Sequence, residues 1–358
     1  MIGREIKMNN KEFLATEPIG KLLLRLAIPT LAAQMINMLY NIIDRIYIGH
    51  IPGSGALALT GVGVCMPLIM IISAFAALVG NGGAPRASIL MGKKDLDSAE
   101  NILGNCFTMQ IIISVILTLI MFFGNRTFLM AFGASENTIE YAVSYMNIYS
   151  LGTIFVQLTL GMNAFITAQG FAKTGMYSVL IGAVINIILD PIFIFACHMG
   201  VRGAALATII SQACSCIWVL SFLFGTKSTL RIKKQNLTLK APVILPCLAL
   251  GLSLFIMQAS ESIISVCFNS SLLKYGGDVA VGAMTILTSV MQFAMLPLQG
   301  LGQGAQPIMS YNYGAKESAR VRKIYLMTFE IVVGIMAVGT VICFVVPQTL
   351  MSMFTNNP

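Results

Sequence analysis

Hydrophobic residues in this chain fall into nine long, nearly continuous runs, and the polar segments between the runs are short. Each run is long enough to cross a lipid bilayer as an α-helix, which takes about 20 residues. The runs do not alternate apolar with polar positions, as the shorter strands of a membrane β-barrel do. The pattern therefore predicts an all-α polytopic membrane protein with spans at about 22–46, 56–80, 102–123, 141–166, 175–197, 203–224, 242–268, 279–300 and 324–346.

Composition agrees with a membrane protein and excludes a soluble domain. Hydrophobic residues make up 57% of the 358 residues and charged residues only 10%, whereas a soluble domain carries about 25% charged residues. The eight Cys are too few for a disulfide framework in a chain of this length. We expect them to pack as small apolar side chains.

Basic residues are distributed unevenly between the two sides of the predicted membrane. If odd-numbered spans run outward, 18 of the 22 Lys and Arg residues lie on the cytoplasmic side, and the outer side receives only Arg45, Arg126, Arg202 and Lys274. Cytoplasmic loops of membrane proteins carry such an excess, so we expect a protein of the cell membrane with a cytoplasmic N-terminus. The net charge of +8 then orients the chain and does not indicate a nucleic-acid partner.

Two segments about 221 residues apart resemble each other. Gly83-Ala84-Pro85 precedes Gly92-Lys93-Lys94 in the first, and Gly304-Ala305-Gln306-Pro307 precedes Gly314-Ala315-Lys316 in the second. The pairs Leu129-Met130 and Leu350-Met351 have the same spacing. A repeat that contains six spans predicts two six-helix bundles, related by a pseudo-two-fold axis along the membrane normal.

The repeat also sets the expected domain boundaries. Residues 1–21 form a cytoplasmic segment, 22–226 the six-helix N-lobe, 227–241 a basic cytoplasmic linker, and 242–358 the first three helices of the C-lobe. Adding one repeat length to the linker predicts a complete chain of about 450–460 residues with twelve spans. We therefore expect the second bundle to be incomplete in this sequence, with nine spans present.

Four acidic residues lie inside the predicted spans: Asp44, Asp190, Glu261 and Glu330. An acidic side chain in the bilayer costs about 2.5–3.5 kcal/mol on insertion scales, so each one needs a reason. Glu330 lies two turns inside its span, where pairing with Lys323 would account for it. Glu261 stays open between a structural role and a functional one.

The two aspartates have polar companions on their own helix faces. Tyr40 and Asn37 lie four and seven residues before Asp44, and Asn186 lies four residues before Asp190. Carboxylates, amide carbonyls and hydroxyls are the hard ligands that Na⁺ prefers, and a carboxylate pair is equally a proton carrier. The pattern predicts an ion site.

Asn163 and Thr208 are uncharged oxygen donors in the same half of the chain. The alternative for these two residues is hydrogen bonding between helices, which membrane bundles use commonly.

Several motifs in this order and spacing resemble those of the multidrug and toxic compound extrusion (MATE) transporters, most closely the bacterial and archaeal branches. The likeness covers nearly the whole chain. Its motifs are Pro29 followed by the run 41–50, then 162–170, 186–191, 203–208, 303–307 and 311–314. The resemblance implies two six-helix lobes that form a V, and export of bulky organic cations in exchange for Na⁺ or H⁺.

The resemblance also implies roles for individual residues. The coupling ion is expected at Tyr40, Asp44, Asn163, Asn186, Asp190 and Thr208, with Asp44 and Asp190 as the Na⁺ ligands if the ion is Na⁺. The exported cation is expected at Gln34, Asn37 and Glu261. The chain is then a monomeric transporter with small-molecule and lipid partners and no cofactor besides the coupling ion, and it is not an enzyme.

Three other functions compete with export. A lipid-linked sugar flippase of the same wider superfamily would favour cationic pockets for pyrophosphate. An intramembrane aspartyl protease would use Asp44 and Asp190, but the nearest approach to its Gly-x-Gly-Asp motif is Gly276-Gly277-Asp278, in a predicted outer loop. The third is a non-transporting structural or receptor fragment.

The charge asymmetry gives a direct test of topology. On a background without native cysteines, His198→Cys should react with an impermeant maleimide in intact cells, because position 198 is expected outside. Lys233→Cys, in the basic linker, should be protected until the cells are opened. The reverse labelling pattern contradicts the predicted orientation.

Overall fold

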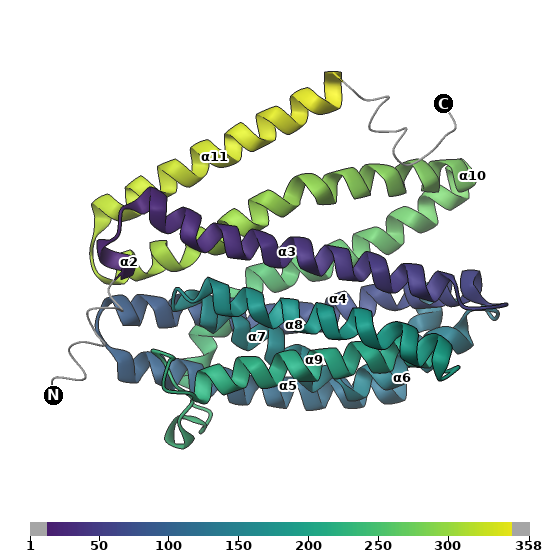
Figure 1. The fold of residues 1–358 in the computed structure, drawn as a ribbon, viewed down its shortest axis with the longest axis horizontal. Helices are drawn as coiled ribbons and strands as arrows, with labels where there is room; N and C mark the ends of the chain where they lie inside the picture. Colours follow the sequence, from purple (N-terminus) through teal and green to yellow (C-terminus); the bar gives the residue numbers. More distant parts are fainter. Residues whose placement is uncertain (1–12, 346–358) are drawn as a thin grey trace.

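The computed structural model describes residues 13–345, except for some side chains between 262 and 293 and that of residue 343. Every regular element in this range is helical (Figure 1). The elements are α2 (Phe13–Thr16), α3 (Ile19–Gly49), α4 (Gly55–Gly92), α5 (Leu96–Ala131), α6 (Ile139–Leu151), α7 (Thr153–Ala168), α8 (Ala172–Pro191), the π-helix η1 (Ile192–Ala196), α9 (Val201–Phe224), the 3-10 helix η2 (Lys234–Asn236), α10 (Ala241–Gly314) and α11 (Ser318–Val345).

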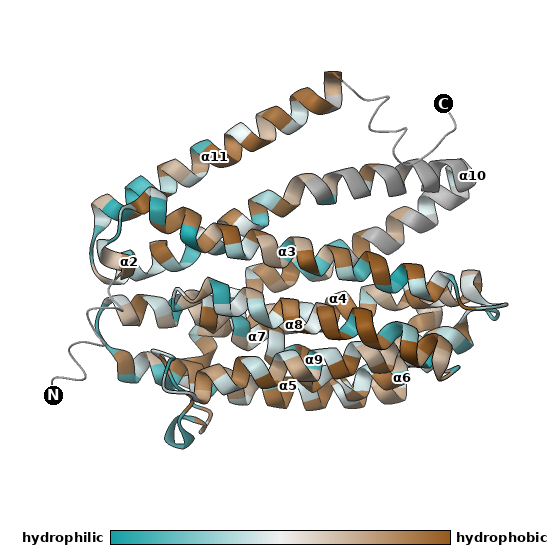
Figure 2. Ribbon diagram, in the orientation of Figure 1, coloured by the Kyte–Doolittle hydropathy of each residue, from teal (hydrophilic) through white to brown (hydrophobic). Residues whose placement is uncertain are grey.

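The described helices confirm the prediction of an all-α membrane protein. Seven are long and apolar enough to cross a bilayer, or eight if a bent pair counts as one span. Hydrophobic residues cover the middle of the bundle, and hydrophilic residues gather toward its ends (Figure 2). The predicted run 279–300 lies inside α10, where many side chains are outside the described residues. The count of nine spans therefore stays a prediction.

The bent pair is α6 and α7, which together replace the single predicted span 141–166. The two helices meet at Gly152 with a bend of 58°. A β-carbon at Gly152 would collide with the side chain of Ile209 on α9. Only glycine allows the backbone to come this close to α9, and the bend occurs at this contact.

The long helix α10 reverses its direction. It covers two of the predicted spans, 242–268 and 279–300. A straight helix of its 74 residues would be about 110 Å long. Its two ends instead contact the same end of α4: the Cys247 carbonyl lies where a β-carbon on Gly82 would be, and Ser88 Oγ donates to the Pro307 carbonyl at 3.3 Å. Figure 1 shows the helix turning back at the far end of the molecule.

One end of the bundle collects most of the basic loops, and we call it the basic end. Helices α3, α5 and α8 begin at this end, and helices α4, α7 and α9 end here. Both ends of α10 also lie at this end. The turns 50–54, 132–138 and 197–200 form the opposite end. Which end faces the cytoplasm stays a prediction.

We call helices α3 to α9 the first bundle. The linker between α9 and α10, residues 225–240, is hydrogen-bonded to this first bundle at the basic end. Gln169, which follows α7 and is only 2% exposed, accepts three hydrogen bonds through its Oε1. The donors are Ser228 Oγ at 2.9 Å and the backbone N–H groups of Thr229 and Leu230, each at 2.8 Å. The start of the linker therefore has a fixed position on α7.

Two side chains of α5 hold the rest of the linker. The buried carboxylate of Glu100 accepts from the Arg231 N–H at 3.2 Å and pairs with Lys233. Asn105 Oδ1 accepts from the Lys240 N–H at 2.6 Å, immediately before α10 begins. The linker is therefore a fixed part of the first bundle, although its composition alone suggests only a charged connection.

Removing the Gln169 acceptor should destabilise the protein. In Gln169→Ala the backbone N–H groups of Thr229 and Leu230 lose their partner, whereas Ser228 Oγ keeps the Leu230 carbonyl at 2.6 Å. Each unsatisfied buried donor costs about 1–3 kcal/mol. We expect a loss of about 2–4 kcal/mol in stability, measured as a lower melting temperature in detergent. Gln235→Ala, at an exposed linker position, is the control and should melt like the wild type. Equal melting of both variants would contradict the role of Gln169.

Candidate ion and substrate sites

Two buried aspartates face each other between α3 and α8. Asp44 is 6% exposed and Asp190 is fully buried, and their carboxyl groups lie within hydrogen-bonding reach of each other. Each aspartate has a polar residue one turn earlier on its own helix, Tyr40 on α3 and Asn186 on α8, as the four-residue spacing predicts. The two helix faces thus form one polar cluster within an apolar bundle.

Backbone irregularity begins directly after Asp190. Pro191 ends α8 and has no N–H to donate to the carbonyl four residues earlier, and the chain continues as the π-helix η1. Single π-helical turns inside longer helices occur frequently at functional sites. Asp190 is therefore the second-to-last residue of a regular helix that changes its winding at the polar cluster.

Several oxygen atoms in this cluster have no hydrogen-bond donor. Asn186 Nδ2 donates to Asp190 Oδ1 at 3.2 Å. Asp190 Oδ2, Asp44 Oδ1 and Asn186 Oδ1 are buried and have no hydrogen-bond partner among the described residues. Neither carboxylate forms an ion pair with a described basic side chain. Buried, unpaired oxygens are costly, and this cluster holds three of them.

Two tyrosines of α6 complete the cluster, and sequence reasoning missed both. Tyr145 and Tyr149 are buried and stack with ring centroids 6.0 Å apart. Tyr145 lies beside Asp44 and interacts with the hydroxyl of Thr208 on α9, which also donates to the Ala204 carbonyl at 3.0 Å. A signal was present, since two tyrosines one turn apart inside an apolar run share a helix face.

Asn163 does not lie with the other predicted ion ligands. Its Nδ2 donates to the carbonyl of Gly175 at 3.3 Å, near the start of α8. Gly175 precedes Asn186 by 11 residues, which is about 16 Å along the helix axis. Tyr40, Asp44, Asn186 and Asp190 are brought together, and Thr208 joins them through Tyr145. Asn163 lines a neighbouring cavity, which it shares only with Tyr40 among these residues.

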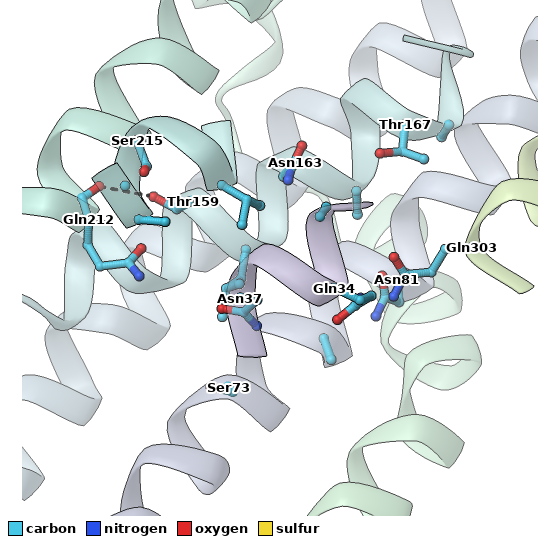
Figure 3. A pocket seen from close by; sticks show the side chains of 18 of the residues that line it. Gln34, Asn37, Ser73, Asn81, Thr159, Asn163, Thr167, Gln212, Ser215 and Gln303 are labelled. Atoms are coloured by element: carbon cyan, nitrogen blue, oxygen red, sulfur yellow. Dashed lines mark hydrogen bonds between the residues drawn. The ribbon is translucent and has the colours of Figure 1, made fainter. Parts of the chain in front are cut away.

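This cavity has a volume of about 380 Å³ and lies between the first bundle and α10 (Figure 3). Gln34, Asn81 and Gln303 lie on one side of it, and Thr159, Gln212 and Ser215 on another. No acidic or basic side chain is among the described residues that line it. Its polar character comes mainly from eight carboxamides: Gln34, Asn37, Asn81, Asn163, Gln212, Gln258, Gln303 and Gln306.

The predicted substrate residues are divided by this geometry. Gln34 and Asn37 line the cavity, as expected for residues that contact a ligand. Glu261 does not line it: Gln258, three residues earlier on α10, does, while Glu261 is exposed. A residue three positions further along a helix is rotated by about 60°, which turns Glu261 away at the edge of the cavity. The structure therefore does not place Glu261 in the cavity with Gln34 and Asn37.

Glu330, the fourth acid in the apolar runs, is exposed on α11. It forms no ion pair with Lys323 among the described residues. The pairing that the sequence suggested is therefore absent from this arrangement.

The chain matches known transporters over nearly its whole length. The MatE family model matches residues 29–192 and 253–358. The multidrug export protein MepA of Staphylococcus haemolyticus is 26% identical over 340 residues, which is 95% of this chain and 74% of the relative. MepA of Staphylococcus saprophyticus is 24% identical with the same two coverages.

Solved structures show the same fold. The MATE multidrug transporter DinF-BH is 35% identical with a TM-score of 0.87, covering 96% of this chain and 76% of that one. A MOP superfamily transporter from Pyrococcus furiosus is 26% identical with a TM-score of 0.87, covering 97% of this chain and 76% of the other.

Proposed function

Because this chain belongs to the MatE family of membrane transporters, we propose that it exports small molecules from the cell in exchange for a cation bound between Asp44 and Asp190. The observation that carries this proposal is the set of three buried oxygens without donors on Asp44, Asn186 and Asp190. They come from two different helices, so a bound cation bridges α3 and α8.

The electrostatics of the pair favour a bound cation. Two ionised carboxylates that approach each other away from water repel strongly and lack the hydration that would stabilise them. A counter-charge removes this cost: either Na⁺ coordinated by both carboxylates with Asn186 Oδ1, or a proton on one of them. Both ions suit the same oxygens, and either one couples the site to an ion gradient.

The ion site and the cavity share the helices that would couple them. Three residues of α3 line the cavity: Gln34, Asn37 and Tyr40. Tyr40 also lies beside Asp44 and Asp190 of the ion site, so it belongs to both sites. An ion that draws α3 toward α8 therefore changes the shape of the cavity. An exporter needs this coupling between the ion site and the cavity. A bound ion shifts the equilibrium between two conformations of the protein only if it binds one of them more tightly than the other.

The cavity suits bulky organic cations whose charge is spread over the molecule. Carboxamide oxygens accept hydrogen bonds from N–H groups of such a ligand. Because no acidic side chain lines the cavity among the described residues, the ligand does not need a localised positive charge to pair with one. MepA relatives are multidrug export proteins. A flippase for pyrophosphate-linked sugars is not favoured, because no Lys or Arg lines the cavity among the described residues. We propose that a monomer carries out export, with its basic end in the cytoplasm.

Ion binding should stabilise the purified protein. A ligand at about 100 times its dissociation constant adds about 2.7 kcal/mol. If the ion is Na⁺, the melting temperature should rise with NaCl and not with matched KCl. If it is a proton, the melting temperature should depend on pH and not on the choice of salt. Asp190→Asn should abolish whichever response the wild type shows.

Two variants serve as controls for this experiment. Asn163→Ala should keep the ion response, because Asn163 bonds to Gly175, which lies about 16 Å along α8 from Asn186. Glu136→Gln, at an exposed position of the opposite end, should also keep it. Loss of the response in Asn163→Ala, or its survival in Asp190→Asn, would place the ion elsewhere.

Export should depend on the amide side chains of the cavity. Asn37→Ala removes a polar contact worth about 1–2 kcal/mol, so we expect about tenfold weaker export of a fluorescent aromatic cation from loaded cells. Glu261→Gln should export at the wild-type rate, since Glu261 is exposed outside the cavity. The opposite result, with Glu261 essential and Asn37 dispensable, would restore Glu261 as the cation-binding residue.

A further inference from the structure

A groove at the basic end of the bundle takes no part in the ion site or the amide-lined cavity. It has a volume of about 580 Å³ and lies where the start of α3 meets the start of α8. Lys21 and Arg25 of α3 and Lys173 of α8 line it, together with one acid, Glu17. Three positive charges from two helices therefore face one negative charge.

The single acid is already bound to one of these cations. Arg25 Nη1 lies 2.7 Å from Glu17 Oε1, and the Arg25 guanidinium lies 4.6 Å from the ring centroid of Phe13. Lys21 and Lys173 are exposed and have no ion-pair partner among the described residues. Two unneutralised positive charges remain, and they favour an anionic ligand.

The groove continues into an apolar surface. Leu24 and Ile28 also line it and are 60% and 59% exposed. On the same helix Met35 and Leu39 are 57% and 56% exposed. Positions four and seven residues apart share a helix face, so these side chains form a stripe that leads from the basic end toward the middle of the bundle. A ligand that fits both parts has an anionic head and a long apolar tail.

We propose that this groove binds an anionic glycerophospholipid of the surrounding membrane. Its phosphate contacts Lys21 and Lys173, and an acyl chain lies along Leu24 and Ile28. Basic pockets between spanning helices, at the level of the headgroups, bind such lipids. A free phosphate ion would use the lysines equally well but would leave the apolar stripe without a partner. The proposal is independent of the exported substrate and of the coupling ion.

The test uses the full chain purified in a neutral detergent. Binding of dioleoyl-phosphatidylglycerol is measured by native mass spectrometry and by the shift in melting temperature. Dioleoyl-phosphatidylcholine has the same chains without net charge, and glycerophosphoglycerol has the same headgroup without chains. We expect phosphatidylglycerol to bind at least tenfold more tightly than either probe. This comparison needs only the wild-type protein.

A pair of double variants then locates the site. Lys21→Gln with Lys173→Gln should weaken phosphatidylglycerol binding about 25-fold, at about fivefold for each basic residue near a membrane surface. Lys227→Gln with Lys234→Gln removes the same charge from exposed linker positions at the same end and should bind like the wild type.

Three results would overturn the proposal. Equal binding of phosphatidylglycerol and phosphatidylcholine would exclude recognition of the charge. Equal binding of glycerophosphoglycerol and the whole lipid would identify a site for a free anion. Equal loss in both double variants would mean that the total charge of this end attracts lipid, and not the groove.

Discussion

A helix inside a bilayer finds no water for its polar side chains, and this constraint determines how the bundle is assembled. Its polar side chains reach the backbone carbonyls of neighbouring helices. Gln157 Nε2 of α7 donates to the Ile72 carbonyl of α4 at 2.7 Å, and Thr30 Oγ1 of α3 donates to the Gly300 carbonyl of α10 at 2.6 Å. A carbonyl oxygen has two lone pairs, so it can accept such a bond and keep its helical one. The helices are thus joined without being unwound.

The cluster around Asp44 and Asp190 departs from this rule. Here the buried groups are acceptors that face one another, and Asn186 has only one amide group to donate to them. Backbone carbonyls satisfy the donors of Gln157 and Thr30, but they cannot satisfy an acceptor oxygen, which needs an N–H or O–H group. Gln157 also keeps one oxygen, Oε1, without a partner, but its amide is neutral, whereas two of the three unpartnered oxygens in this cluster belong to carboxyl groups.

Sequence reasoning succeeded where a single helix settles the answer. The apolar runs give the helices, and the four-residue spacing places Tyr40 with Asp44, because both follow from the helical repeat. It gave less where two helices must be placed relative to each other. Asn163 is expected at the ion site and Glu261 at the substrate, whereas the structure places Asn163 at the cavity wall near the start of α8 and Glu261 at an exposed position of α10. The spacing of Tyr145 and Tyr149 marks a shared helix face, but nothing in their own run indicates that this face meets Asp44 of α3.

The attachment of the linker has a mechanical consequence. A free chain of about 16 residues would let its ends move about 22 Å apart on average, and the two bundles could then separate as well as turn. With Gln169, Glu100 and Asn105 holding residues 228–240, that slack is absent, and Cys247 of α10 already packs on Gly82 of α4. The start of α10 is therefore fixed to the first bundle together with the linker, so any movement of the rest of α10 has to arise beyond the contact between Cys247 and Gly82. A distance probe attached to the linker would report the motion of the first bundle alone.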